Sequence, residues 1–249
     1  MMDGGAARLA PKSCPVCGGD GAHFTTHNGF DLYSCGICGT IYIHPMPTGE
    51  FLAEFYQDRH PYYIDKAAKK LRRARGRVRG MKLFARRGGK FLDIGCNAGF
   101  MVEAAREGGF TANGIDLDAD AVTYAREHFS ANAYHVGPVE GLVTEHAGQF
   151  ALIHSADVIE HVPDARGFAA AIFSLLRPGG YVHLTTPDIT HWRRPRELTA
   201  WDGFIPPNHL IYYNPASLKR LLRDAGFQIV YRKPTLKPRI VLMARRPLS

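Results

Sequence analysis

The sequence predicts an α/β protein with a seven-stranded, mostly parallel sheet, helices on both faces, an antiparallel last strand and a small N-terminal unit. Three observations lead to this prediction. Strand-like and helix-like stretches alternate after residue 89, five residues separate the last two strand-like stretches, and four of the five cysteines form two pairs near the N terminus. At 249 residues the chain is long enough for one large domain and a small one.

The alternation favours a parallel sheet, because parallel strands need crossover connections that place helices on both faces. The last two strands, 228–233 and 239–245, are joined by the short stretch PTLKP, so they are expected to be antiparallel neighbours. The other expected strands are 90–95, 111–118, 132–137, 150–159 and 181–187, the expected helices are 100–109, 119–129, 164–176 and 215–227, and RPGG at 177–180 is expected to be a turn.

The paired cysteines have the spacing of a metal site. Two Cys-x2-Cys pairs lie seventeen residues apart, each followed by glycine, and the expected ligands are Cys14, Cys17, Cys35 and Cys38. Each pair aims two thiolates at one point, so the two pairs form a tetrahedral site suited to Zn²⁺. A rubredoxin-type iron site has the same spacing, and disulfides are disfavoured without a secretion signal. We expect a structural zinc ribbon over residues 1–45, because so short a segment has too little core to fold unaided.

Positive charge is concentrated in one segment. Lys66–Lys90 holds twelve of the 31 Lys and Arg residues and no acid, which leaves 19 bases against 23 acids elsewhere. Apolar residues recur there at helical spacing, so we expect a basic amphipathic helix within a connector at 46–88. This helix is either a solvated element on the main domain or a surface for RNA, an anionic substrate, a carrier or a membrane. The sequence shows no signal peptide and no membrane-spanning stretch, so a cytoplasmic location is expected.

The stretch KFLDIGCNAGF, from Lys90 to Phe100, predicts a strand, a glycine turn and the start of a helix. Its pattern is Asp93-x-Gly95-x-Asn97-x-Gly99, and a second acid, Asp116, ends the next strand. A phosphate-binding loop would need a Lys-Ser/Thr pair after its last glycine, and an acid in the turn repels phosphate. An acid at the end of the next strand suits ribose hydroxyls. The pattern therefore favours a nucleoside that carries a positive charge, and S-adenosylmethionine (SAM) fits.

The segments LDIGCNAG, GIDLD, ADVIEHVPD, LRPGG and TTPD, in this order, resemble a class I SAM-dependent methyltransferase over residues 88–249. The resemblance implies a Rossmann-like fold, with adenine near Val139 and Glu140. The cofactor-binding residues that it implies are Asp93, Gly95, Cys96, Asn97, Gly99, Asp116, Leu117, Ala156 and Asp157. The side chain of Cys96 is expected to be a small packed group, with a nucleophile as the minor alternative.

The four-cysteine head and the segment NHLIYYNPASLKRLLRDAGF resemble a bacterial group of zinc-ribbon methyltransferases that are associated with saccharides and natural products. This likeness covers nearly the whole chain. It implies a ribbon at 1–45, a helical connector at 46–88 and a methyltransferase domain at 89–249 with a substrate insertion at 188–210.

Asp157, Glu160, His161 and the later His209 are the candidate catalytic residues. Their arrangement resembles the metal-binding motif of ubiquinone-pathway O-methyltransferases and small-RNA 2′-O-methyltransferases. Two carboxylates and two imidazoles suit Mg²⁺ or another divalent ion, which would acidify an acceptor hydroxyl. Without a metal, one histidine would act as general base. The remaining alternative is that these residues only shape the loop beside the cofactor.

The insertion at 188–210 breaks the strand–helix rhythm and lies where such sheets bind substrates. Its aromatic residues are expected to form an apolar lid and its arginines to hold an anion, or else the insertion is a surface loop with packed aromatics. The residues concerned are Trp192, Trp201 and Phe204, and Arg193, Arg194 and Arg196, while Tyr62 and Tyr63 are expected to close the pocket from the N-terminal side.

The sequence thus predicts a SAM-dependent methyltransferase that methylates a small-molecule acceptor, with a hydroxyl of a saccharide or secondary metabolite as the expected target. An RNA methyltransferase that grips RNA with the ribbon and the basic helix is the less favoured alternative. A non-catalytic zinc-ribbon binding module is a third alternative, which the intact acids and glycines of the cofactor motif disfavour.

Overall fold

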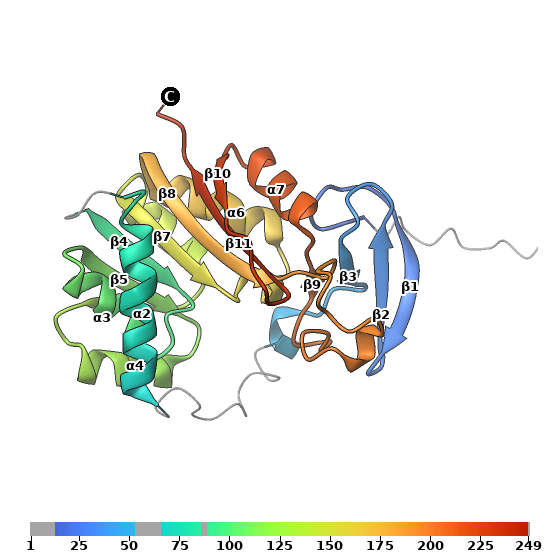
Figure 1. Cartoon of the computed structure of the whole chain (residues 1–249), viewed down its shortest axis with the longest axis horizontal. Helices are drawn as coiled ribbons and strands as arrows, with labels where there is room; N and C mark the ends of the chain where they lie inside the picture. Colours follow the sequence, from blue (N-terminus) through green and yellow to red (C-terminus); the bar gives the residue numbers. More distant parts are fainter. Residues whose placement is uncertain (1–12, 53–65, 86–88, 249) are drawn as a thin grey trace, which may run out of the picture.

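The computed structural model describes residues 13–52, 66–85 and 89–248. The described chain forms two sheets that lie side by side, a large one with helices on both faces and a small one that carries the N-terminal strands (Figure 1).

The large sheet has seven strands in the order β10-β11-β8-β7-β4-β5-β6, and β11 is antiparallel to both of its neighbours. This confirms the predicted fold class, including the antiparallel pair at the end of the chain. The strands are β4 (Lys90–Ile94), β5 (Thr111–Asp116), β6 (Ala133–Val136), β7 (Phe150–Ala156), β8 (Leu176–Pro187), β10 (Gln228–Arg232) and β11 (Arg239–Arg245).

The helices are α2 (Ala67–Met81), α3 (Phe100–Glu107), α4 (Ala119–His128), α5 (Val143–His146), α6 (Ala165–Leu175) and α7 (Pro215–Asp224), with short 3₁₀ turns η1 (Val139–Leu142), η2 (Ile159–His161) and η3 (Leu198–Ala200). Side chains alternate between the two faces of the sheet, so Phe91 and Leu152 join the core under α2 and α3, whereas Leu92 and Ile153 join the core under α6 and α7. Two apolar layers therefore enclose the sheet.

The expectation of a turn at RPGG is wrong, because β8 starts at Leu176 and includes these residues. The backbone bends there without leaving the sheet, since Gly179 takes a φ of 76° and the register with β7 shifts. Residues beyond β11 hold the segment: the Arg246 N–H donates to the Gly180 carbonyl at 2.9 Å, and the Gly179 N–H donates to the Arg246 carbonyl at 3.0 Å. Long-range pairing thus overrides the local turn preference.

The small sheet contains β1 (Gly21–His27), β2 (Phe30–Cys35), β3 (Ile41–Ile43) and β9 (Ile211–Tyr212), in that order. The first three strands follow one another in the N-terminal segment. The fourth comes from the C-terminal half of the chain and pairs antiparallel with β3, with Ile41 opposite Tyr212 and Tyr42 opposite Ile211. The two parts of the chain therefore share one sheet.

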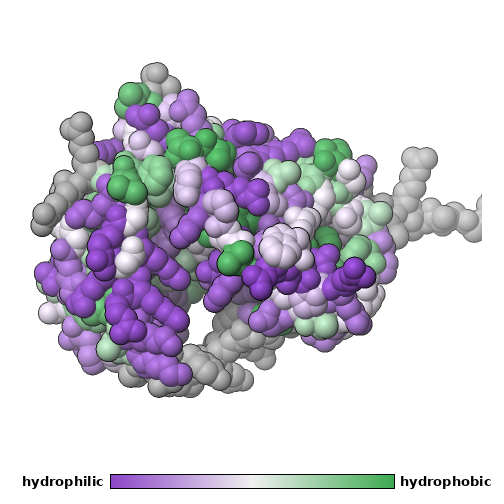
Figure 2. Space-filling model, in the orientation of Figure 1, coloured by the Kyte–Doolittle hydropathy of each residue, from purple (hydrophilic) through white to green (hydrophobic). Residues whose placement is uncertain are grey.

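Helix α2 lies against α3 and the large sheet, with Ala74, Val78 and Met81 buried. Its cationic side chains line the other side, and Figure 2 shows a largely hydrophilic surface over this helix. The basic segment thus forms an amphipathic helix that covers the main domain. Among the described residues, none of the helices combines the length and the apolar character needed to cross a membrane.

Candidate functional site

The candidate residues gather at one edge of the large sheet, where the parallel strands end. Ile94 at the end of β4 lies opposite Ile115 of β5 and Ser155 of β7, and Ala156 of β7 lies opposite Thr185 of β8. Loops that follow these strands therefore meet at the same edge, which is the usual ligand-binding edge of open α/β sheets.

The glycine turn after β4 depends on left-handed backbone conformations. Gly95, Asn97 and Gly99 have φ values of 73°, 48° and 79°. Glycine and asparagine tolerate this region best, so Asn97 fits the turn in place of another glycine. A side chain at Gly95 would clash with Val158, which follows β7. The turn therefore brings bare backbone close to the end of β7.

Asp116 braces this turn. One of its carboxylate oxygens accepts the Asn97 N–H at 2.7 Å, and the other accepts the Asp118 N–H at 3.0 Å. Burial raises the pKa of Asp116. Asp93 is buried at the end of β4, and its pKa is raised well above the usual range by burial and then by the charge of Asp116. Two carboxylates near one turn disfavour an anionic ligand and favour a cationic one.

The other predicted cofactor residues differ in their exposure. Cys96 is buried, and its sulfur packs where a side chain at Gly114 would stand. Leu117 is 70% exposed and Ala156 is half-buried at the end of β7. Near the proposed adenine position, Val139 is buried and Glu140 is exposed. The Cys96 side chain thus has the position of a packed core group.

Glu160, His161 and His209 converge. One potential ligand atom from each lies within 4.8 Å of the others. The ring centroids of the two histidines are 4.8 Å apart, in an edge-to-face arrangement. Glu160 and His161 lie in η2 after β7, and His209 lies at the end of the insertion, so 48 residues of chain fold back to complete the cluster.

Glu160 carries an unsatisfied buried oxygen. Its side chain is 1% exposed, and the Thr186 hydroxyl donates to Oε2 at 2.9 Å. Oε1 has no hydrogen-bond partner among the described residues. Burial, and then the charge of Asp157, raises the pKa of Glu160 to about 8. A buried acceptor without a partner is costly, so a cation or a donor group fits at this position.

The backbone fixes the tautomers of both histidines. His161 Nδ1 donates to the Asn208 carbonyl at 2.5 Å, and His209 Nδ1 donates to the Gly203 carbonyl at 2.9 Å. A neutral ring that donates from Nδ1 has its lone pair on Nε2. Histidines that bind metals commonly donate their other N–H to a backbone carbonyl in this way.

Asp157 is not part of this cluster. Arg239 Nη2 donates to both carboxylate oxygens of Asp157, to Oδ2 at 2.9 Å and to Oδ1 at 3.2 Å. The Thr185 hydroxyl donates to Oδ1 at 3.1 Å. The residue also has a φ of 57°, in the left-handed region that aspartate and asparagine tolerate better than most residues other than glycine. The structure thus brings together three of the four predicted catalytic residues and pairs the fourth with an arginine.

The insertion divides into packed and exposed parts. Trp201 and Phe204 are buried in the main core, so they do not form a movable lid. Trp192 is 77% exposed, with the Arg193 guanidinium over its ring. Arg194 donates to the carbonyls of Ile189, Pro195 and Arg196, so it stabilises the insertion itself. The Arg196 side chain is exposed, and Tyr62 and Tyr63 lie outside the described residues.

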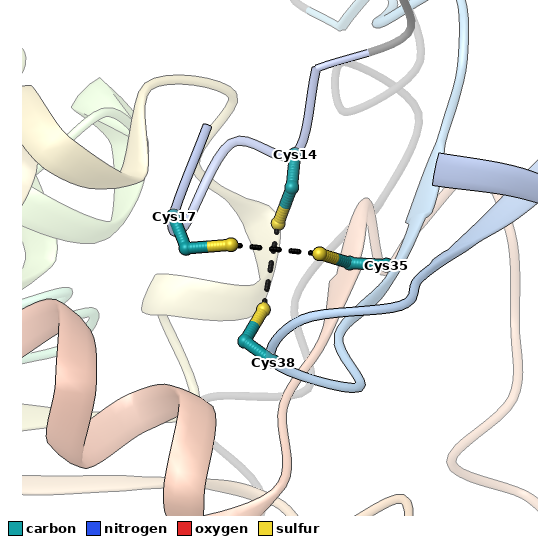
Figure 3. Close-up of side chains that lie close together, drawn as sticks. All are labelled: Cys14, Cys17, Cys35 and Cys38. Atoms are coloured by element: carbon teal, nitrogen blue, oxygen red, sulfur yellow. Dashed lines mark hydrogen bonds between the residues drawn. The ribbon is translucent and has the colours of Figure 1, made fainter. Parts of the chain in front are cut away.

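The four paired cysteines converge from two loops (Figure 3). Cys14 and Cys38 have Sγ atoms 3.6 Å apart, Cys17 and Cys35 have theirs 3.5 Å apart, and none of these residues is in a disulfide. A tetrahedron with Zn–S bonds of about 2.3 Å has edges of about 3.8 Å, close to these distances. The glycines after the pairs, Gly18 and Gly39, have φ values of 73° and 68°. The site therefore has the size and turn geometry of a four-thiolate zinc site.

Sequence reasoning missed several residues that shape the cluster. Arg239 reaches Asp157 from a strand 82 residues away, and Asn208 and Gly203 act through backbone carbonyls. No local pattern marks these contacts. Thr186 lies in the TTPD segment, but nothing in the sequence indicated that its hydroxyl would contact Glu160.

Comparison with known proteins is consistent with this geometry. Residues 58–232 match the profile of a family described as a methyltransferase domain. Ubiquinone biosynthesis O-methyltransferases from Bordetella avium and Psychrobacter arcticus are 37% and 34% identical over 103 and 156 residues, which are 40% and 56% of this chain. The matches cover 43% and 59% of the two relatives.

A solved SAM-dependent methyltransferase from Mesorhizobium loti has the same fold. It superposes with a TM-score of 0.56 at 19% identity, over 69% of this chain and 96% of the solved chain.

Proposed function

Because the chain belongs to the family of methyltransferase domains, we propose that it transfers a methyl group from SAM to a hydroxyl oxygen of a small-molecule acceptor. The observation that carries this proposal is the buried Oε1 of Glu160, which has no partner in the described part of the chain and lies beside His161 and His209. Such a cluster suits the removal of a proton from a hydroxyl. The O-methyltransferase names of the two relatives support oxygen as the acceptor atom.

The glycine turn is the proposed SAM site. Asp93 would face the methionine ammonium, because a positive charge would relieve the cost of burying this carboxylate beside Asp116. Asp116 would accept hydrogen bonds from the ribose hydroxyls while it braces the turn. Gly95 would allow the ligand to approach the backbone closely.

Glu160, His161 and His209 are the proposed holders of a divalent cation. One carboxylate and two imidazoles suit Mn²⁺, Fe²⁺ or Zn²⁺ and are less suited to Mg²⁺, which prefers oxygen ligands. When bound, such a cation supplies a positive charge that makes an acceptor hydroxyl more acidic. The chain itself contributes fixed Nδ1–H tautomers and a carboxylate that Thr186 orients. We place Asp157 outside this ligand set, because Arg239 and Thr185 already contact its carboxylate.

A metal-independent route remains the second candidate for the same residues. Nε2 of His161 or His209 would accept the hydroxyl proton as general base, since the neutral tautomer holds its lone pair there. The two routes differ in their sensitivity to chelators. Only the metal route predicts loss of activity in EDTA and recovery with Mn²⁺.

The four cysteines are proposed to bind one structural Zn²⁺. All four ligand positions are filled by thiolates, which leaves no open position for catalysis. The metal would stabilise the small sheet, in which β1 contributes no buried side chain and the buried residues come from β2, β3 and β9.

The basic helix α2 is proposed to attract an anionic substrate or a carrier to the enzyme. Seven lysine and arginine side chains from Lys66 to Arg79 are exposed. One of them, Arg75, forms a salt bridge with Glu107 at 2.6 Å. This excess of positive charge would raise the encounter rate with anions at low ionic strength. RNA is the alternative anion, and methyl label recovered in RNA and not in small molecules would favour it.

The test of the proposed reaction is methyl transfer from SAM with an isotope-labelled methyl group to a panel of phenolic, catechol and saccharide acceptors. NMR of the labelled product distinguishes a methyl group on oxygen from one on nitrogen or carbon. An O-methyl product with the wild-type protein and none with Glu160→Gln is the expected result. An N-methyl or C-methyl product would contradict the proposed chemistry.

A further inference from the structure

Both cysteine turns of the small unit contact the beginning of a helix in the main domain. Each of these helices follows directly on a segment that carries proposed catalytic residues. Helix α6 follows Glu160 and His161, and α7 follows His209. The metal-binding turns therefore lie against the two segments whose spacing determines the cluster.

The second turn contacts α7 through Asn214. Its Nδ2 donates to the carbonyl of Cys38 at 2.9 Å, while its Oδ1 accepts the N–H groups of Ala216 and Ser217, each at 2.9 Å. Asn214 thus caps α7 and grips the turn with the same side chain. The fit is close, because a side chain atom at Gly39 would lie 3.0 Å from Nδ2.

The first turn contacts α6 through Arg166. Its Nε donates to the Val16 carbonyl at 3.2 Å, from the first turn of that helix. A side chain at Gly18 would stand 2.9 Å from the Arg166 guanidinium, so this contact is also close. Val16 lies between Cys14 and Cys17 of the first cysteine pair, and Cys38 is the last residue of the second pair. Each contact is therefore made to the backbone of a cysteine turn.

A backbone path joins the small sheet to the cluster. The Ile43 N–H of β3 donates to the Leu210 carbonyl at 3.0 Å, and the Leu210 N–H donates to the Glu160 carbonyl at 2.8 Å. His209 precedes Leu210 and packs 6.0 Å from the Tyr212 ring of β9. One residue, Leu210, therefore links a strand of the ribbon to Glu160 through its two backbone groups.

We propose that the four-cysteine unit is a positioning clamp that holds the segments 159–166 and 208–214 at the spacing that brings Glu160, His161 and His209 together. The inference rests on the proposed function of these three residues. It assigns the ribbon a role in the active site beyond its own folding. Asn214 is the positioning residue of the clamp, since its amide nitrogen is the contact between α7 and a ligand-bearing turn.

The hydrogen bond between Asn214 and the Cys38 carbonyl can be removed without replacing a cysteine. Loss of the thiolates is expected to unfold the small sheet, which would not separate folding from positioning. Asn214→Asp keeps an oxygen that caps α7 but replaces the amide donor with an acceptor that faces the Cys38 carbonyl. Asp118→Asn is the matched control, because it makes the reverse exchange at the N-cap of α4, a helix that packs on β5 and β6 of the large sheet.

Four measurements on the zinc-loaded full chain test the proposal. In Asn214→Asp we expect unchanged zinc content and unchanged SAM affinity, hydrogen exchange at the Leu210 amide that is roughly 10-fold faster, and Mn²⁺ binding to the three-residue cluster that is roughly 10-fold weaker by electron paramagnetic resonance. The control should leave exchange at Leu210 unchanged. Equal Leu210 exchange and equal Mn²⁺ affinity in Asn214→Asp and the wild type would overturn the clamp. If the wild type itself binds no Mn²⁺, the metal proposal fails, and exchange at Leu210 alone decides the clamp.

Discussion

The role of Asp116 gives the sharpest prediction about the cofactor site. Replacing Asp116 with alanine removes the acceptor of the Asn97 and Asp118 N–H groups, and it removes the proposed acceptor of two ribose hydroxyls. A hydrogen bond to a charged group is worth about 1.5–3 kcal/mol. Loss of the two ribose bonds is therefore expected to raise the Kd for SAM roughly 100- to 10,000-fold, since about 1.4 kcal/mol corresponds to a factor of ten.

Isothermal titration calorimetry with SAM measures this change directly. Asp118→Asn is a suitable control, because it removes a carboxylate two residues away while an oxygen remains to cap α4. The control should bind SAM with wild-type affinity. If Asp116→Ala folds and binds SAM within about threefold of the wild type, well under the loss of one hydrogen bond, the assignment of the cofactor site is wrong.

Three further results are expected. Metal analysis should find one zinc per chain, which is lost when Cys14 and Cys35 become serine; a folded, zinc-free wild type would contradict the ribbon. The contribution of His183 to the free energy of unfolding should fall by about 3 kcal/mol as the pH drops from about 6.5 to 4, because burial and nearby cations lower its pKa to about 4, so the unfolded chain takes up a proton that the folded chain resists; urea denaturation of His183→Gln with the pH dependence of the wild type would refute it. Glu160→Gln should abolish Mn²⁺ binding and leave SAM affinity intact. Mn²⁺ binding by Glu160→Gln with wild-type affinity would mean that the cation lies at another site.

Features that depend on local spacing could be predicted from the sequence. The strand, turn and helix around Gly95 appear where the pattern of apolar residues and glycines indicates them. The two cysteine pairs converge as their spacing predicts, because each short turn fixes the direction of its own thiolates. The antiparallel pairing of β11 with β10 follows from the short connection between them.

Features that depend on long-range pairing could not be predicted. The spacing of Asp157 in the motif predicted a metal ligand, but Arg239 of β11 forms a salt bridge with its carboxylate. The two-residue strand β9 is too short for any periodic signal, although it joins the ribbon to the main domain. Phe204 of the insertion packs against Tyr212 of β9, with ring centroids 4.9 Å apart, and Trp201 is buried in the same core cluster.

Methyl transfer to a small molecule is the activity that we assign to the cluster around Glu160. The most direct test adds the wild-type protein and radiolabelled SAM to an extract of the source cells, with and without EDTA, and separates small molecules from RNA. We predict label in the small-molecule fraction, loss of that label in EDTA, recovery with Mn²⁺, and none with Glu160→Gln. Label in RNA would contradict the assignment of the acceptor, and full activity of Glu160→Gln would contradict the role of the cluster.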